Sequence, residues 1–246
     1  MSRYDGKNVV ITGGSSGLGL AAAQFLVDNG ARVLVTGRRQ DTLDDAGRQL
    51  GASGITVRSD ASSLPDIDAL AGRVKDEFGT VDALVVNAGI GSFDPFDAVT
   101  EQTFDEVFAV NTKGPFFTVQ RLAPLLSEGS GVVLTTSIAN QTGWDALSVY
   151  SASKAALRSM ARTLSRELLP RGIRVNAISP GSIDTGKLEK EAPEKAAQLK
   201  AEFTASSPMK RWGRPSEFAP AVAFLALDAT YVAGTELVVD GGESQL

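Results

Sequence analysis

Short apolar runs alternate with amphipathic stretches along almost the whole chain of 246 residues. The runs are rich in β-branched residues and show little polar alternation, which is typical of parallel strands covered on both faces. They lie at residues 9–12, 33–37, 55–59, 83–87, 132–137, 174–179 and 236–240. Between them, apolar positions recur at helical spacing, most clearly at residues 66–78, 104–126, 150–169 and 215–227. These strand–helix units predict an α/β fold, a single-domain, doubly wound parallel sheet of about seven strands with helices on both faces.

One segment departs from this alternation. Residues 182–208 are charged and helical in pattern, and they follow the strand predicted at residues 174–179. That places them at the carboxyl edge of the sheet, where ligands bind in such folds. A mobile substrate lid and a solvated surface helix both fit the segment, and its position favours the lid. No linker or repeat divides the chain, so residues 1–246 are predicted to form one domain.

The first predicted strand runs into a glycine-rich loop, residues 12–19, with the sequence TGGSSGLG. Glycines let a backbone approach a pyrophosphate closely, and the N-terminus of the following helix offers free N–H groups and a positive dipole end. The spacing Gly-x-x-x-Gly-x-Gly differs from the Gly-x-Gly-x-x-Gly of the commoner fingerprint. We predict a dinucleotide-binding loop, with a simple turn between strand and helix as the alternative.

The composition narrows the chemistry. The chain has no histidine and no cysteine, which excludes a Ser-His-Asp hydrolase, thiol catalysis, disulfides and histidine- or cysteine-bound metals, and we expect no metal site. A net charge of −5 gives no general attraction to nucleic acid or anionic membranes. No run approaches the ~18 apolar residues that span a bilayer, and the first residues lack a signal peptide's apolar stretch. We therefore expect a cytoplasmic protein whose acid–base chemistry uses Tyr, Lys, Asp or Glu.

Tyr150 and Lys154 are the strongest candidates for that chemistry. They lie four residues apart in a predicted helix, so their side chains share one face. A lysine ammonium ~4 Å from the phenol would favour the phenolate and lower the tyrosine pKa from about 10 toward neutrality. The phenol could then give or take a proton during a reaction. A solvated helix face is the alternative for the pair taken alone.

In their order and spacing, the motifs resemble those of the short-chain dehydrogenase/reductase family, whose fold is Rossmann-like. The resemblance runs from about residue 7 to residue 242 and is closest to bacterial NADPH-dependent alcohol dehydrogenases and carbonyl reductases. The motifs that carry it are the loop at residues 12–19, Asn87-Ala88-Gly89, Asn111, Ser137, Tyr150-x-x-x-Lys154 and Pro180-Gly181.

The resemblance implies a role for each catalytic candidate. Tyr150 would be the general acid in reduction and the general base in oxidation, and Lys154 would adjust its pKa and hold the ribose hydroxyls of the nicotinamide nucleoside. Ser137 would hydrogen-bond the substrate carbonyl oxygen. Asn111, inside the predicted helix 104–126 and beside a Gly-Pro pair, would support a water-mediated proton path to the lysine. The alternative role of Asn111 is that of a polar residue that satisfies hydrogen bonds at a helix kink.

The resemblance also assigns cofactor contacts. Asp60 would meet the adenine amino group or merely cap a helix, and Asn87 would support the adenosine half or simply end a strand. Thr185 would lie near the nicotinamide carboxamide or the diphosphate. The expected cofactor residues are Gly13, Ser15, Ser16, Gly17, Leu18, Gly19, Gly37, Arg38, Arg39, Asp60, Ala61, Asn87, Ala88, Gly89, Tyr150, Lys154, Pro180, Gly181, Ile183 and Thr185.

The end of the second predicted strand favours NADP(H) over NAD(H). An NAD site wants a carboxylate there for the adenosine ribose hydroxyls. This chain instead has Gly37, which leaves room for a 2′-phosphate, followed by Arg38 and Arg39, whose guanidinium groups can clasp it. Two arginines opening a solvated helix are the alternative. Ser16 departs from the many NADP-dependent members that carry a basic residue at that position.

We predict an NADP(H)-dependent carbonyl reductase, or reversible secondary alcohol dehydrogenase, for bulky apolar ketones. Residues 91–93, 140–144, 147 and 183–188 would form the substrate walls. The alternative is a 3-oxoacyl-thioester reductase, which needs a basic patch for an acidic carrier protein, with Arg121, Arg158 and Arg162 as candidates. A non-catalytic dinucleotide sensor is a minor alternative, because such chains often lose the tyrosine or the lysine.

The helical stretch at residues 104–126 carries more apolar side chains than one sheet face requires. Family members commonly pair this helix and the next across a two-fold axis. We therefore expect a homotetramer, with a dimer as the next choice.

Overall fold

The computed structural model describes residues 2–191 and 193–246, so Met1 and Ala192, the latter inside the expected lid, lie outside the described residues. One seven-stranded parallel sheet has the order β3-β2-β1-β4-β5-β6-β7, which confirms the predicted fold class. Its strands are β1 (Asn8–Thr12), β2 (Arg32–Gly37), β3 (Gly54–Arg58), β4 (Val81–Val86), β5 (Leu126–Thr135), β6 (Arg174–Pro180) and β7 (Glu236–Val239). The chain order reverses beside β1, where the neighbours are β2 and β4.

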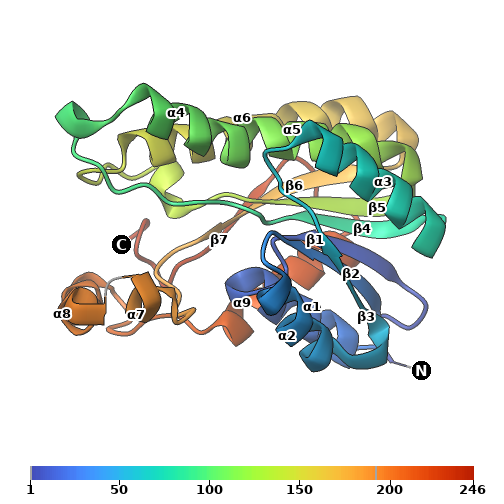
Figure 1. Ribbon diagram of the computed structural model, residues 1–246, viewed down its shortest axis with the longest axis horizontal. Coiled ribbons are helices and arrows are strands. Elements are labelled where there is room, and N and C mark those ends of the chain that lie inside the picture. Colours follow the sequence, from blue (N-terminus) through green and yellow to red (C-terminus); the bar gives the residue numbers. More distant parts are fainter. Residues whose placement is uncertain (1, 192) are drawn as a thin grey trace.

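Helices cover both faces of this sheet. Figure 1 shows α3 to α6 on one face and α1, α2 and α9 on the other. Alternate residues of β1 serve the two layers: Val9 and Ile11 belong to one buried apolar cluster and Val10 to the other. The helices are α1 (Gly17–Asp28), α2 (Gln40–Leu50), α3 (Leu64–Phe78), α4 (Glu101–Phe108), α5 (Gly114–Leu122), α6 (Ser148–Leu168), α7 (Lys187–Glu191), α8 (Pro193–Ser206) and α9 (Pro215–Ala223).

The helical stretch predicted at residues 104–126 is continuous, and its regular hydrogen bonding is disturbed beside Gly114-Pro115, as expected. A π-helical turn, Ala109–Lys113, separates α4 from α5, and a 3-10 turn, Ala123–Leu125, ends α5. Pro115 has no N–H to donate, so regular hydrogen bonding is interrupted at this point. Strand β5 consequently begins at Leu126, earlier than the predicted residue 132. A second π-helical turn, Phe224–Asp228, likewise follows α9 within the helix predicted at residues 215–227.

The charged insert folds as the two helices α7 and α8. Figure 1 places them beside each other, near the C-terminal end of the chain. The insert is joined to the rest of the chain by a bridge between Ile183 and Gly213, and an ion pair of 2.7 Å between Lys200 and Asp184 ties α8 to the start of the insert. Among the helices described, none combines the length and apolarity needed to cross a membrane.

Candidate active site

The glycine loop between β1 and α1 is packed too tightly for side chains at Gly13, Gly14 and Gly19. A Cβ on Gly13 would lie 2.7 Å from the Cα of Ala88, and a Cβ on Gly19 would lie 2.4 Å from the Gly13 carbonyl oxygen. Ser16 precedes α1 without capping it through its side chain. The first N–H groups of α1 therefore face the loop beneath a close-packed backbone, which fits a dinucleotide pyrophosphate.

Asn87 holds this loop to the neighbouring strand. Its amide Nδ2 donates to the carbonyl oxygens of Thr12 and Gly13, at 3.3 and 3.1 Å, and its backbone N–H donates to the Thr12 hydroxyl. The Thr12 hydroxyl also accepts from the N–H of Ala88. Asn87 thus ties the glycine loop to the end of β4 through these hydrogen bonds.

The catalytic candidates converge at the carboxyl end of β5. Ser137 lies just past that strand and caps a 3-10 turn, Ile138–Asn140, where its hydroxyl accepts from the N–H of Ala139 at 3.2 Å. Tyr150 and Lys154 both lie on α6, as predicted, and the Lys154 Nζ is 5.8 Å from the Tyr150 ring centroid. The same Nζ donates to the Thr135 carbonyl at 2.9 Å. Helix α6 is thereby tied to the strand that presents Ser137.

The expected lowering of the tyrosine pKa is not found. Burial raises the pKa of Tyr150 above its usual value of 10.0, and a hydrogen bond with the Ser137 side chain opposes the rise. Burial, and then the positive charge of Lys187, lower the pKa of Lys154 from 10.5 to about 8. Desolvation penalises the charged form of each group. The arrangement therefore keeps the phenol protonated, as a proton donor in reduction requires.

Asn111 is fully buried in the π-helical turn and joins three segments. Its side-chain oxygen accepts from the N–H of Ile90, and its Nδ2 donates to the Ile90 carbonyl, both at 2.9 Å. The same Nδ2 donates to the Ser153 hydroxyl at 3.1 Å, next to Lys154 in the chain. A Cβ on Gly89 would lie 3.3 Å from the Asn111 oxygen and 3.2 Å from the Lys154 Nζ, so the loop after β4 passes both side chains closely.

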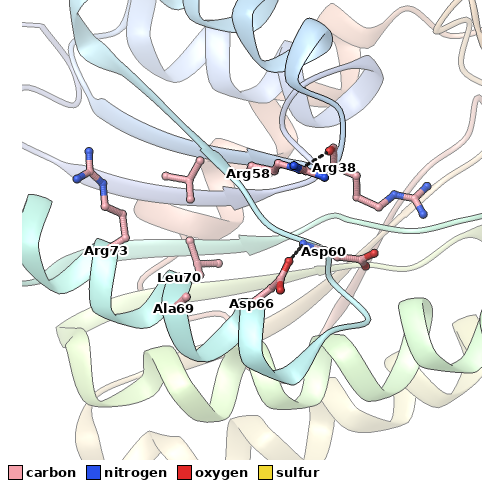
Figure 2. Close-up of a pocket in the computed structure, with 8 residues that line it drawn as sticks. Arg38, Arg58, Asp60, Asp66, Ala69, Leu70 and Arg73 are labelled. Carbon is pink, nitrogen blue, oxygen red and sulfur yellow. Dashed lines mark hydrogen bonds between the residues drawn. The ribbon is translucent and has the colours of Figure 1, made fainter.

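A pocket of about 620 Å³ lies beyond the ends of β2 and β3, against α3. Figure 2 shows Arg38 and Arg58 at one end and Arg73 at the other. The Arg58 Nε donates to the Arg38 carbonyl at 3.2 Å. The sequence analysis did not single out Arg58, although it pairs with Gly37 across the two strands. The complete lining is Arg38, Val57, Arg58, Asp60, Asp66, Ala69, Leu70 and Arg73.

Asp60 lies in this pocket but its carboxylate is already engaged. One carboxylate oxygen accepts from the N–H of Ser62 at 2.9 Å and from the Ser62 hydroxyl at 2.7 Å. The N–H of Asp60 donates to Asp66 at 2.8 Å (Figure 2). The cap of α3 is Ser63, whose hydroxyl accepts from the N–H of Asp66. Asp60 therefore shapes the turn before α3 and is not itself the helix cap.

Gly37 packs directly against the glycine loop. A Cβ at this position would lie 2.4 Å from the Ser15 hydroxyl oxygen. Thr42 extends the contact, because its hydroxyl donates to the Ser15 hydroxyl at 3.4 Å. The charged neighbours of Gly37 point outward: Arg38 and Arg39 are exposed, and Arg39 forms an ion pair of 3.2 Å with Asp41.

The remaining expected contacts lie past β6. Thr185 lies beside the glycine loop, since a Cβ on Gly17 would be 3.6 Å from the Thr185 Cβ. Gly181 packs against the end of β7, where its N–H donates to the Val239 carbonyl at 3.0 Å and a Cβ would lie 2.5 Å from that of Asp240. The structure thus brings the segment 180–185 to the same edge of the sheet as the loop at residues 12–19.

Aromatic side chains connect the insert to the loop that follows Ser137. Phe203 of α8 lies between Trp144 and Trp212, with edge-to-face ring centroids 6.4 and 5.6 Å apart. The Trp212 indole N–H donates to the Lys200 carbonyl. Trp144 belongs to the segment expected to form a substrate wall. This cluster presents aromatic surface at the junction of the insert and that loop.

A parallel, doubly wound sheet with a glycine loop after β1 defines the class of dinucleotide-binding α/β proteins. Comparisons with known proteins agree. Residues 13–244 match the family model described as Enoyl-(Acyl carrier protein) reductase. The chain is 40% identical over 249 residues to the oxidoreductase asL5 of Sarocladium schorii, with 100% of this chain and 99% of that protein covered.

Two solved structures share the whole fold. One is a short-chain dehydrogenase/reductase, glucose/ribitol dehydrogenase, from Brucella melitensis, with a TM-score of 0.89, 33% identity, and 100% and 99% of the chains covered. The other is a levodione reductase, with a TM-score of 0.92, 32% identity, and 98% and 99% covered. The chain therefore belongs to the short-chain dehydrogenase/reductase family and is an oxidoreductase that acts on alcohol or carbonyl groups.

Proposed function

We propose that the protein is an NADP(H)-dependent carbonyl reductase, working reversibly as a secondary alcohol dehydrogenase on bulky apolar substrates. The observation that carries the proposal is the convergence of Ser137, Tyr150 and the buried Lys154 at the carboxyl end of β5. When bound, the nicotinamide cofactor supplies or accepts the hydride. Tyr150 gives its phenolic proton to the carbonyl oxygen, and the Ser137 hydroxyl donates a hydrogen bond to the charge that develops there.

Lys154 acts through its charge and its position. Its ammonium lies over the Tyr150 ring and is held by the Thr135 carbonyl. A positive charge at this distance stabilises the Tyr150 phenolate that remains after proton transfer. The negative charge formed in the reduction step is therefore partly balanced by Lys154. Asn111 fixes the segment around Ser153 from within the π-helical turn. We assign it a positioning task through these hydrogen bonds.

The preference for NADP(H) rests on the end of β2. A carboxylate side chain at position 37 would displace Ser15, whose hydroxyl lies 2.4 Å from where its Cβ would be. The usual acidic partner of the NAD ribose therefore does not fit without a shift of the loop. Arg38 is exposed beside this site, and Arg58 holds the Arg38 backbone. Guanidinium groups suit a 2′-phosphate because they bind it through paired, charge-assisted hydrogen bonds.

A 3-oxoacyl-thioester reductase is the second candidate, because the description of the matching family model names a reductase of acyl-carrier-protein thioesters, although of enoyl ones. The structure weakens the basic patch that such an enzyme would offer a carrier protein. Arg158 is largely buried and paired with Glu236 at 2.7 Å, and Arg121 is paired with Asp68 at 2.6 Å. Only Arg162, of the three candidates, is left exposed without a described ion pair.

Turnover with NADPH tests both candidates in one assay. Ketones graded from acetone to diaryl compounds are compared with a 3-oxoacyl thioester on its carrier protein, with nicotinamide absorbance as the readout. We expect the highest kcat/KM on the bulky free ketones. A higher value on the carrier-bound thioester would replace the first proposal with the second, and no turnover on either substrate class would contradict both.

We also propose that the chain forms a homotetramer in the cytoplasm, with a dimer as the alternative. Phe104 and Phe116 are 44% and 38% exposed on α4 and α5. Phe116 also lines a groove of about 220 Å³ between α5 and α6. Exposed aromatic residues next to an apolar groove suit burial against another copy of this chain. Light scattering that finds a monomer at assay concentration would contradict both assemblies.

A further inference from the structure

A chain of polar side chains runs from the outer strand of the sheet to the backbone of Ser137. Glu236 of β7 is largely buried, and its two carboxylate oxygens have different partners. One accepts from the Arg158 Nε at 2.7 Å. The other accepts from the Asn140 Nδ2 at 2.6 Å and from the Ser179 hydroxyl at 2.5 Å. The Asn140 Nδ2 also donates to the Ser137 carbonyl at 2.6 Å.

The chemistry of these groups fixes their orientation. An ionised carboxylate only accepts hydrogen bonds, so Glu236 requires the NH₂ end of the Asn140 amide to face it. The second hydrogen of that NH₂ is then directed at the Ser137 carbonyl. The Arg158 guanidinium supplies the balancing charge, without which a buried carboxylate is costly. The orientation of the Asn140 amide group thus depends on the ion pair between Glu236 and Arg158.

Arg158 also links this chain to the helix that carries the other catalytic candidates. It lies one turn beyond Lys154 on α6, and its ion pair joins α6 to β7. Its buried Nη1 has no hydrogen-bond partner within the described part of the chain. A buried donor without a partner costs folding free energy. Any stabilisation by Arg158 must therefore come from the charge that it balances on Glu236.

We propose that Arg158, Glu236 and Asn140 are positioning residues, which hold the Ser137 carbonyl so that the Ser137 hydroxyl faces Tyr150. This inference rests on the proposed function, because it assigns Ser137 and Tyr150 their roles in carbonyl reduction. The ion pair orients the Asn140 amide, the amide fixes the turn Ile138–Asn140, and the turn sets the Ser137 side chain.

Asn140→Ala tests the inference most directly, with Asn176→Ala as the matched control. Asn176 is fully buried, donates to the Val232 carbonyl at 2.9 Å and accepts from the N–H of Thr235. Both substitutions remove an amide that connects strand ends, but only Asn140 contacts Ser137. We expect Asn140→Ala to lower kcat by about tenfold to a hundredfold while the KM for NADPH stays within about threefold. Asn176→Ala should leave kcat within about threefold and lower only the thermal midpoint.

A spectroscopic readout separates this inference from the proposed function. The chain has three tyrosines, Tyr4, Tyr150 and Tyr231. Labelling their Cζ atoms with carbon-13 gives one resonance each, and Tyr150→Phe assigns the one in the site. Asn140→Ala should move the Tyr150 resonance and leave that of Tyr4 in place, and Asn176→Ala should move neither. This result does not depend on turnover, so an inactive wild-type protein would contradict the proposed function while the resonance still decides the positioning role.

The ion pair is tested by a double-mutant cycle. Glu236→Gln and Arg158→Leu should each lower kcat by about tenfold, and the double variant should lose no more than either single variant, because both act through Asn140. If a Glu236 variant does not fold, the Asn140 measurements decide alone. An unmoved Tyr150 resonance in Asn140→Ala would overturn the inference, with or without a fall in kcat. If the losses in kcat add in the double variant, the ion pair between Arg158 and Glu236 takes no part in positioning Ser137.

Discussion

The two ends of the candidate site are built in opposite ways. At the catalytic end, Asn111, Ser137 and Lys154 are at most 8% exposed and lie in networks of buried hydrogen bonds. At the other end, where we propose that the adenosine half of the cofactor binds (the adenosine end), Arg38 and Arg58 are exposed around an open pocket. Buried hydrogen bonds fix geometry, whereas exposed charges act over a distance and adapt to a ligand. From this difference we expect that the catalytic end is preformed and that the cofactor preference is set by binding affinity.

The catalytic end should show the largest effect of a single substitution. Tyr150→Phe removes the proton donor but keeps the ring, so kcat should fall by about 10²–10⁴-fold, the contribution typical of acid–base catalysis. NADPH binding, followed by nicotinamide fluorescence, should change by less than about threefold. Tyr231→Phe is the control, because that side chain is fully exposed and away from the site. Equal activity of the two variants would remove Tyr150 from the mechanism.

Gly114 is where the two ends meet, so its substitution should damage both. A Cβ there would lie 1.9 Å from the Ala61 carbonyl, in the loop that leads from the adenosine pocket to α3. Gly114→Ala should cost about 1–3 kcal/mol of unfolding free energy through overpacking. Gly72→Ala, in α3 with open space around it, should instead stabilise by about 0.5–1 kcal/mol. Urea denaturation compares the two, and a neutral Gly114→Ala would show that this contact does not join the two ends.

The adenosine end should control cofactor affinity alone. Arg38→Gln should raise the KM for NADPH by about tenfold, the loss expected for one charge-assisted contact, and leave kcat and the KM for NADH unchanged. Arg73→Gln is the control, because Arg73 lies at the far end of the pocket in an ion pair with Glu77. Initial rates with both cofactors give the answer. A fall in kcat would mean that the two ends are not separate.

The smallest predicted effect concerns pH. Lys154 has a pKa of about 8, lowered from 10.5 by burial and then by Lys187. Since the ammonium is required, kcat/KM for reduction should decline as the pH rises through about 8. Because the folded pKa lies below the unfolded one, the charged lysine destabilises the fold below pH 8, and that cost fades as the pH rises to 10.5.

Lys187→Gln removes one of the two causes that lower the Lys154 pKa. The alkaline limb of the profile of kcat/KM against pH should therefore move to higher pH by a few tenths of a unit. Lys190→Gln, three residues further along α7, is the control. A shift to lower pH, or an equal shift in both variants, would show that Lys187 does not act on Lys154.

The sheet could be predicted from the sequence, and candidate site residues could be chosen, because both depend on local pattern. Glycine spacing, apolar runs and the Tyr150–Lys154 interval are visible along the chain. The π-helical turn between α4 and α5 could be predicted only in part, because Pro115 indicates an irregular helix but not the type of irregularity. The direction of the Tyr150 pKa shift was predicted wrongly, because burial raises this pKa and burial is a property of the packed fold.

Long-range partners were missed for a similar reason. Asn140 and Glu236 are separated by 96 residues and meet only because β7 begins at Glu236 opposite Ala177 of β6, close to where β5 and β6 end. Arg158 was interpreted as part of a surface patch, since an arginine on a helix gives no sign of a buried partner. The strand register would have revealed Arg58, because it lies opposite Gly37.

Initial rates of the wild-type protein with NADPH and with NADH, on one bulky apolar ketone, test the central claim most directly. The account predicts kcat values within about threefold of each other and a KM lower for NADPH by about tenfold or more. Equal KM values with unequal kcat, or a lower KM for NADH, would contradict the separation of a preformed catalytic end from a cofactor-selecting end.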